Sequence, residues 1–255
     1  MKVDLGKRIR FFRDRAEMSQ LDLEAATGLA SGAISRIEHN QVNPTKETIL
    51  SIGKVLNLGN REIDYLIGKT ALPPTQDEIN KARKEASKFL NKRGRLAYLL
   101  DERWRFQMIS KTFIKLLKFE PTELDYIIGK TTAEVIVDKD SPVLKRVDQD
   151  FYKELLAIYL PQYYSRLSYM DDDEIYLRTV EAIMKNNIAK EIWTGLVSQN
   201  YKKDALQEDR FIRFDIWGVK FSLYYAMVPL MLNSRFKIIE FSTKNKVLDL
   251  LPYLA

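Results

Sequence analysis

Residues 19–40 hold the pattern with the clearest chemical use, a run of small polar side chains and one arginine beside a sharp turn. Leu23 and Ala26 have the spacing of one buried helix face, and Gly28 stands where the chain must turn and where glycine accepts a positive φ at little cost. Ile34 and Ile37 are spaced to anchor a following helix from the same side. Small residues at the start of an exposed helix allow it to enter the major groove of duplex DNA. The residues expected to face outward from this helix are Ser31, Gly32, Ser35 and Arg36.

The chain offers few residues for covalent, redox or metal chemistry. It has no cysteine, which excludes a disulfide framework, a thiolate metal site and a cysteine nucleophile. Its one histidine, His39, cannot form a histidine metal cluster by itself. We therefore expect neither a metal site nor a cofactor.

Two other motifs resemble ligand sites but have simpler explanations. Gly-Lys-Thr occurs at 68–70 and at 129–131, but a Walker phosphate loop needs a glycine five residues before the Gly-Lys pair, where this chain has Ile63 and Leu124. We expect each of these glycines to end a short helix in the left-handed conformation. The acidic run 171–174 lacks the glycine and the final glutamate of a calcium loop, and it indicates a helix start, where negative charge is favourable.

Length and composition indicate a protein of two globular domains. The chain has 255 residues, of which 45% are hydrophobic, so it can bury substantial cores. Its net charge of +6 is compatible with nucleic-acid binding but mild. The longest apolar run, 223–232, contains Pro229 and is far shorter than the ~20 residues of a membrane span. The charged N-terminus does not resemble a signal peptide. We expect a cytoplasmic protein that does not associate with membranes.

Residues 1–70 predict an all-α domain of five short helices. In the first helix, Leu5, Ile9 and Phe12 recur at helical spacing between basic residues. Caps and breakers set the other boundaries. They are Ser19 and Gly28 for the second helix, Ser31 and Glu38 for the third, Pro44-Thr45 and Gly59-Asn60 for the fourth, and Gly68 for the end of the fifth.

Residues 71–94 predict a linker and a connector helix. Pro73-Pro74 marks the linker, and residues 76–94 form a charged helix whose apolar positions are sparse. Its excess of basic residues is better explained by a solvated face than by DNA contact. A contact between two copies of the chain is a further use for this helix.

Six local motifs between residues 5 and 68 occur together in one known family. They are Gly-Lys-Arg-Ile-Arg at 6–10, Arg13, Ser-Gln at 19–20, Gly28, Ile-Ser-Arg-Ile-Glu at 34–38 and Asn-Pro at 43–44. This combination resembles the Cro/CI repressor family of helix-turn-helix domains, also called the xenobiotic-response-element family. The chain departs from the family at Glu24, where alanine is usual, and at His39-Asn40, where many members have a small residue and a glycine.

The resemblance implies a role for individual residues. Gln20 should contact a phosphate at the start of the second helix, aided by the helix dipole. Ser31, Gly32 and Arg36 match positions that face base edges, and a guanidinium such as that of Arg36 can grip guanine O6 and N7. Arg13 and Glu38 match an internal salt bridge. Residues that would touch the DNA backbone are Ser35, His39, Asn40 and Asn43.

Residues 95–255 predict an α+β domain with an antiparallel sheet and a large helical insertion. Apolar runs at 96–100 and 104–109 indicate two strands, and Ser110 is the expected cap of the next helix. Largely helical segments follow at about 143–160 and 174–193. Alternating patterns predict three closing strands at 211–217, 219–231 and 236–243, with a hairpin turn at Asn233-Ser234.

The segments 96–119 and 211–243 resemble a PAS domain, and the whole chain is then similar to MmyB-like regulators, whose C-terminal half is PAS-like. The resemblance implies a sensing domain with a ligand between sheet and helices. The chain has no cysteine for flavin attachment and no histidine in this domain for haem, so a small apolar or lipid-like ligand is the hypothesis that remains. The aromatic and apolar residues expected to line its pocket are Tyr98, Trp104, Trp217, Phe221, Tyr225 and Met227.

We consider three functions for this chain. The first is a sequence-specific transcription regulator that binds a near-palindromic operator as a homodimer and responds to the apolar ligand. The second is an enzyme that carries a helix-turn-helix, which the lack of a nucleophile–histidine pair, metal cluster or phosphate loop disfavours. The third is an antitoxin-like regulator whose second domain binds a partner protein.

Overall fold

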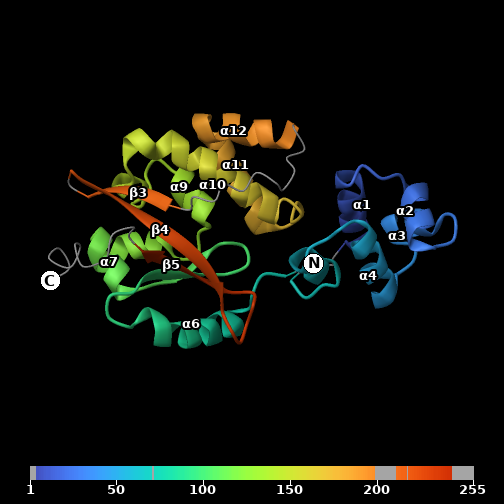
Figure 1. The fold of residues 1–255 in the computed structure, drawn as a ribbon, viewed down its shortest axis with the longest axis horizontal. Coiled ribbons are helices and arrows are strands. Elements are labelled where there is room, and N and C mark those ends of the chain that lie inside the picture. Colours follow the sequence, from blue (N-terminus) through green and yellow to red (C-terminus); the bar gives the residue numbers. More distant parts are fainter. Residues whose placement is uncertain (1–3, 71, 199–210, 217, 243–255) are drawn as a thin grey trace. The chain divides into compact units, whose positions relative to one another are not determined.

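The computed structural model describes residues 4–70, 72–198, 211–216 and 218–242. The chain divides into two compact units, residues 1–73 and 74–255 (Figure 1). Across the described residues, no helix combines the length and the apolar character that crossing a membrane requires. Each unit has its own buried apolar core.

The first unit is helical. Ser19 and Thr45 cap their helices as predicted, since each side-chain oxygen accepts a backbone N–H of the first turn. The core between the helices includes the fully buried Ile9, Phe12 and Leu23. The helices are α1 (Leu5–Arg15), α2 (Gln20–Thr27), α3 (Ala33–Glu38), α4 (Lys46–Val55) and α5 (Asn60–Leu66).

Two details of the first unit differ from the sequence-based expectation. The third helix begins at Ala33 and not at Ser31, because Gly32 adopts a left-handed conformation with φ +76° and lies in a turn. Ala26 is exposed, although its spacing from Leu23 predicted a place in the core. The buried residues of α2 are instead Leu23 and Glu24, so the inner face of this helix includes an acidic side chain.

The described strands of the second unit form one antiparallel sheet in the order β2-β1-β5-β4-β3. The strands at the two ends of the domain meet in the middle, where Tyr98 of β1 pairs with Ile239 of β5. The predicted turn at Asn233 joins β4 and β5, since Phe236 N donates to Asn233 O over 3.0 Å. The strands are β1 (Leu96–Leu100), β2 (Phe106–Ile109), β3 (Phe211–Ile216), β4 (Val219–Pro229) and β5 (Lys237–Ser242).

The second strand begins two residues later than predicted. Trp104 has a φ of +64° and closes a tight turn in which its N–H donates to Asp101 O over 3.0 Å. A bulky residue in this conformation cannot continue a strand. Trp104 therefore belongs to the β1–β2 turn, where it is buried.

A long helical stretch separates β2 from β3, as the sequence predicted. Ser110 and Asp173 cap α7 and α11 through their side-chain oxygens. Leu144–Arg146 and Gln149–Phe151 form two 3₁₀ turns, so the helix expected over 143–160 begins at Tyr152 and continues to Leu167. The helices are α7 (Lys111–Leu117), α8 (Pro121–Ile127), α9 (Thr132–Val137), α10 (Tyr152–Leu167), α11 (Glu174–Lys185) and α12 (Asn187–Ser198).

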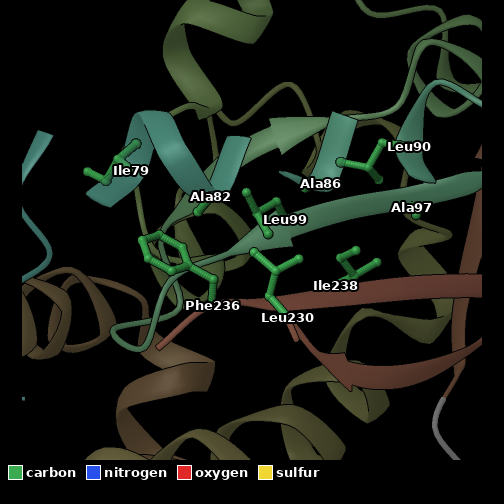
Figure 2. Close-up of a cluster of buried hydrophobic side chains, with 9 residues drawn as sticks. All are labelled: Ile79, Ala82, Ala86, Leu90, Ala97, Leu99, Leu230, Phe236 and Ile238. Atoms are coloured by element: carbon green, nitrogen blue, oxygen red, sulfur yellow. The ribbon is translucent and has the colours of Figure 1, made fainter. Parts of the chain in front are cut away.

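Helix α6 (Gln76–Leu90) packs on the sheet and does not stand apart as a connector. Figure 1 shows it on one side of the sheet, with α10, α11 and α12 on the other. In Figure 2 its apolar side chains point toward residues of β1, β5 and the β4–β5 turn. The cluster consists of Ile79, Ala82, Ala86 and Leu90 from α6, with Ala97, Leu99, Leu230, Phe236 and Ile238.

Candidate nucleic-acid interface

The segment from α2 to α3 is bounded by strong local signals. Ser19 and Asp22 form a capping box at the start of α2, with Asp22 N donating to the Ser19 hydroxyl over 3.1 Å. Gly28 ends α2 with a φ of +72°, as predicted. The chain then turns through residues 29–32 into α3. The sequence therefore places a second short helix directly after a rigid turn, which is the arrangement that presents a recognition helix.

One side chain from each of α1, α2 and α3 meets the other two at the C-terminal end of α3. The Arg13 guanidinium of α1 donates to both carboxylate oxygens of Glu38, with Nε 2.6 Å from Oε1 and Nη2 3.1 Å from Oε2. Gln20 of α2 donates its amide to the same carboxylate over 2.7 Å. The hydrogen bond to Glu38 raises the pKa of Arg13, because it favours the charged guanidinium. The predicted Arg13–Glu38 salt bridge is present, and it ties the end of α3 to α1.

Gln20 remains a predicted phosphate contact. It is half-buried at the first position of α2, and its amide nitrogen is held by Glu38. This contact fixes the side chain at the start of α2, beside the end of α3. A phosphate there would meet the N-terminal backbone of α2 as well as the amide.

The start of α3 is held by a residue whose role the sequence did not reveal. Glu24 is 4% exposed, and its carboxylate accepts Gly32 N at 3.1 Å and Ile34 N at 2.9 Å. In the sequence, this position departs from the family pattern, and no function follows from that departure. The available signal was an acidic residue on the inner face of α2, four positions before the helix-ending Gly28.

The residues predicted to face bases differ in their exposure. Ser31 and Arg36 are exposed, whereas Gly32 is half-buried. Ser35, which was predicted to touch the DNA backbone, is half-buried as well. Among the described residues, the Arg36 guanidinium has no hydrogen-bond or ion-pair partner. Its backbone is fixed by two bonds, since its N–H donates to Gly32 O and its carbonyl accepts Gln41 N. A rigid backbone with an unoccupied guanidinium suits base readout.

The predicted backbone contacts after α3 fall into two groups. His39 and Asn43 are exposed, and His39 Nδ1 lies 2.7 Å from Ser35 O at the end of α3. Asn40 has a φ of +55° and joins the loop to the start of α1, where its Oδ1 accepts Gly6 N and its amide donates to Asp4. Asn40 therefore also has a structural role that the sequence did not predict.

A small apolar cavity of about 50 Å³ lies in the second unit, between the sheet and the helices that follow β2. Tyr98 lines it, as predicted, and burial raises the pKa of this phenol far above its ordinary value. Other lining residues include Phe106, Phe113, Thr132, Tyr159, Phe214 and Phe241.

Of the other residues predicted for this pocket, the four that the structure describes do not line the cavity. Trp104 packs edge-on against Tyr159 and Tyr163, because the left-handed turn directs it there. The remaining three lie on β4, where Phe221 stacks on Phe214, Tyr225 packs against Phe241, and Met227 Sδ accepts from Arg166. Trp217 lies outside the described residues.

Comparisons with known proteins bear on the first unit. Residues 9–59 match a protein-family model described as Helix-turn-helix. The chain is also similar to the HTH-type transcriptional regulator ImmR of Bacillus subtilis (strain 168), with 29% identity over 101 residues, which cover 39% of this chain and 77% of the relative. The first unit is therefore a helix-turn-helix domain of the Cro/CI type, and both similarities support DNA-binding transcription regulation.

Proposed function

We propose that the chain is a sequence-specific DNA-binding transcription regulator that acts in the cytoplasm as a homodimer. The observation that carries this proposal is the exposed guanidinium of Arg36, which has no partner among the described residues and lies on a helix fixed by Glu24 and Glu38. Selection from a pool of random duplexes tests it. Enrichment of one motif is the expected result, and a pool that stays random after repeated rounds would contradict the proposal.

The geometry of the helix-turn-helix supports the proposed homodimer. One six-residue recognition helix reads only a short half-site, so two copies on a near-palindromic operator give the specificity that regulation needs. The selected motif should then contain two inverted half-sites about one helical turn apart. A single unrepeated half-site, together with a monomeric mass in native mass spectrometry, would argue against the dimer.

We propose that the second unit is PAS-like and senses a small apolar ligand. The strand order β2-β1-β5-β4-β3, with the helices inserted between β2 and β3, supports this reading. The cavity of about 50 Å³ is apolar and lies where the resemblance expects a ligand. Drug-sized ligands occupy about 300–1,000 Å³, so a lipid-like ligand requires the side chains around Tyr98 to move apart.

One observation favours a partner protein as the alternative. Met231 and Leu232, at the β4–β5 turn, are 96% and 86% exposed. Neighbouring exposed apolar side chains of this size are typical of protein contacts. Native mass spectrometry of the purified protein separates the two readings, because a co-purified small molecule supports sensing and a co-purified protein supports the alternative. We propose no enzymatic activity and no cofactor for this chain, since it lacks cysteine and has one histidine, at the end of α3.

A further inference from the structure

The recognition helix α3 begins without a local cap. Its N-cap residue is Gly32, which has no side chain to accept a backbone N–H, and the helix is only six residues long. The first N–H groups of a helix need acceptors, because no earlier turn supplies them. Ser31, a residue type that often caps helices, precedes the left-handed Gly32 and does not serve here.

The missing acceptor comes from the preceding helix. Glu24 Oε2 accepts Gly32 N at 3.1 Å and Oε1 accepts Ile34 N at 2.9 Å. The backbone carbonyl of Glu24 also accepts Leu29 N at 3.0 Å. One residue of α2 thus holds the chain at three points between Leu29 and Ile34.

We propose that Glu24 is a positioning residue for DNA recognition. Its buried carboxylate fixes the start of α3, so that Ser31 and Arg36 remain available to contact DNA. This inference rests on the proposed function. Because the cap is buried and comes from another helix, the Ser31 hydroxyl is not used in capping and stays on the exposed surface. Both of the outward residues nearest the turn therefore depend on a carboxylate that DNA does not touch.

The chemistry of the site requires a carboxylate. Both oxygens of Glu24 accept N–H donors, and a charged acceptor makes hydrogen bonds about twice as strong as a neutral one. The amide of a glutamine has one acceptor oxygen, and its NH₂ group would face the second donor. Replacement by glutamine therefore breaks one of the two contacts while the side chain keeps its size.

The experiment compares full-length Glu24→Gln with a matched control, Glu62→Gln. Glu62 is another buried glutamate of the same unit, and its carboxylate accepts Gly59 N at 2.7 Å at the start of α5. Both variants lose a charged cap, and Glu62→Gln also loses an ion pair with Arg15 at 2.7 Å, but only Glu24 supports α3. The measurements are the affinity for the motif selected by the wild type, the affinity for unrelated duplex DNA, and amide hydrogen exchange at Gly32 and Ile34.

Glu24→Gln should lower the affinity for the selected motif by about tenfold or more and leave the affinity for unrelated DNA within about twofold. Exchange at Gly32 and Ile34 should become faster. Glu62→Gln should lower the melting temperature without changing the ratio of the two affinities. If Glu24→Gln does not fold, Glu24→Ala replaces it, since alanine is usual at this position in the resembled family and the fold should tolerate it. The same loss of selectivity is expected, because alanine offers no acceptor to Gly32 N or Ile34 N.

The outcomes separate the two claims. The inference is overturned if Glu24→Gln or Glu24→Ala keeps the wild-type selectivity and amide hydrogen exchange at Gly32 and Ile34 is unchanged. The proposed function would then remain in place. Equal losses of selectivity in Glu24→Gln and Glu62→Gln overturn it as well, because the effect would then be general destabilisation. A wild-type protein that selects no motif overturns the proposed function and this inference with it.

Discussion

Arg13 and Glu38, which are 25 positions apart in the sequence, form a two-pronged ion pair that joins α1 to the end of α3. The side chains are 10% and 2% exposed, so the pair is largely shielded from water. Met18 O accepts a further bond from Arg13 Nη1 at 2.8 Å. The C-terminal end of the recognition helix is therefore held by α1, while its N-terminal end is held by Glu24.

Arg13→Ala should destabilise the first unit by about 3 kcal/mol, because it leaves the Glu38 carboxylate buried without its charge partner. Denaturant unfolding followed by circular dichroism measures this loss. The matched control is Arg10→Ala, which removes an exposed ion pair with Asp14 at 3.7 Å and should cost less than about 1 kcal/mol. Equal losses of unfolding free energy in the two variants would show that burial of the Arg13–Glu38 pair does not add to stability.

Gly6→Ala should destabilise the first unit by about 2 kcal/mol, through crowding at a tight contact. A Cβ at Gly6 would lie 2.4 Å from Glu38 O and 2.6 Å from Ile37 O, and backbone atoms cannot move aside cheaply. Thermal unfolding checks the prediction. Gly195→Ala in α12 is the control, since a Cβ there meets nothing within 4 Å and alanine favours a helix. A neutral Gly6→Ala would mean that α1 and α3 are less closely packed than described.

Phe236→Ala should destabilise the second unit by about 3–5 kcal/mol, because a fully buried ring between α6 and the sheet would be replaced by a cavity. Met231→Ala, five positions earlier and 96% exposed, should change stability by less than about 0.5 kcal/mol. Denaturant midpoints of the two variants give the comparison. A mild effect of Phe236→Ala would place α6 outside the core of this unit.

Asp148→Asn should lower the melting temperature at pH 7 and have little effect at strongly acidic pH. The hydrogen bond from Lys220 Nζ, 2.8 Å away, holds the pKa of Asp148 below its ordinary value. A carboxylate with a lowered folded-state pKa stabilises the fold above its unfolded value, about 3.9, and this contribution disappears as the pH falls through the folded value. Melting curves of wild type and variant from pH 7 to pH 2 test the sign. If the difference in melting temperature between wild type and Asp148→Asn grows as the pH falls, the pKa of Asp148 is not lowered in the folded protein.

Local signals made the first unit largely predictable from the sequence. Ser19 and Gly28 bound α2 because caps and left-handed glycines act within a few residues. The Arg13–Glu38 pair followed from the family resemblance, since no local rule connects residues so far apart. The role of Glu24 could not be predicted, because it depends on the way the turn folds back over α2.

In the second unit too, the sequence predicted local elements but not the contacts between distant residues. Alternating residues predicted the closing strands, whose observed ends differ by a few residues. Helix α6 has sparse apolar positions, and nothing in its own sequence indicates that Leu230 and Phe236, at least 140 positions later, pack against them. Most of the residues around the cavity were also missed, because they come from helices and strands whose packing no local pattern indicates. Trp104 was predicted there but lies in the β1–β2 turn, in a backbone conformation rare for tryptophan.

The most direct test of the central claim is the effect of Arg36→Ala on binding to the motif that the wild type enriches. Loss of a guanidinium that grips a base costs about 1–3 kcal/mol of discrimination, so preference at one base pair of each half-site should relax. Arg61→Ala removes another exposed arginine of the first unit, from α5, and should leave the preference intact. If Arg36→Ala binds the same sites with unchanged preference at every base pair, α3 is not the element that reads the DNA.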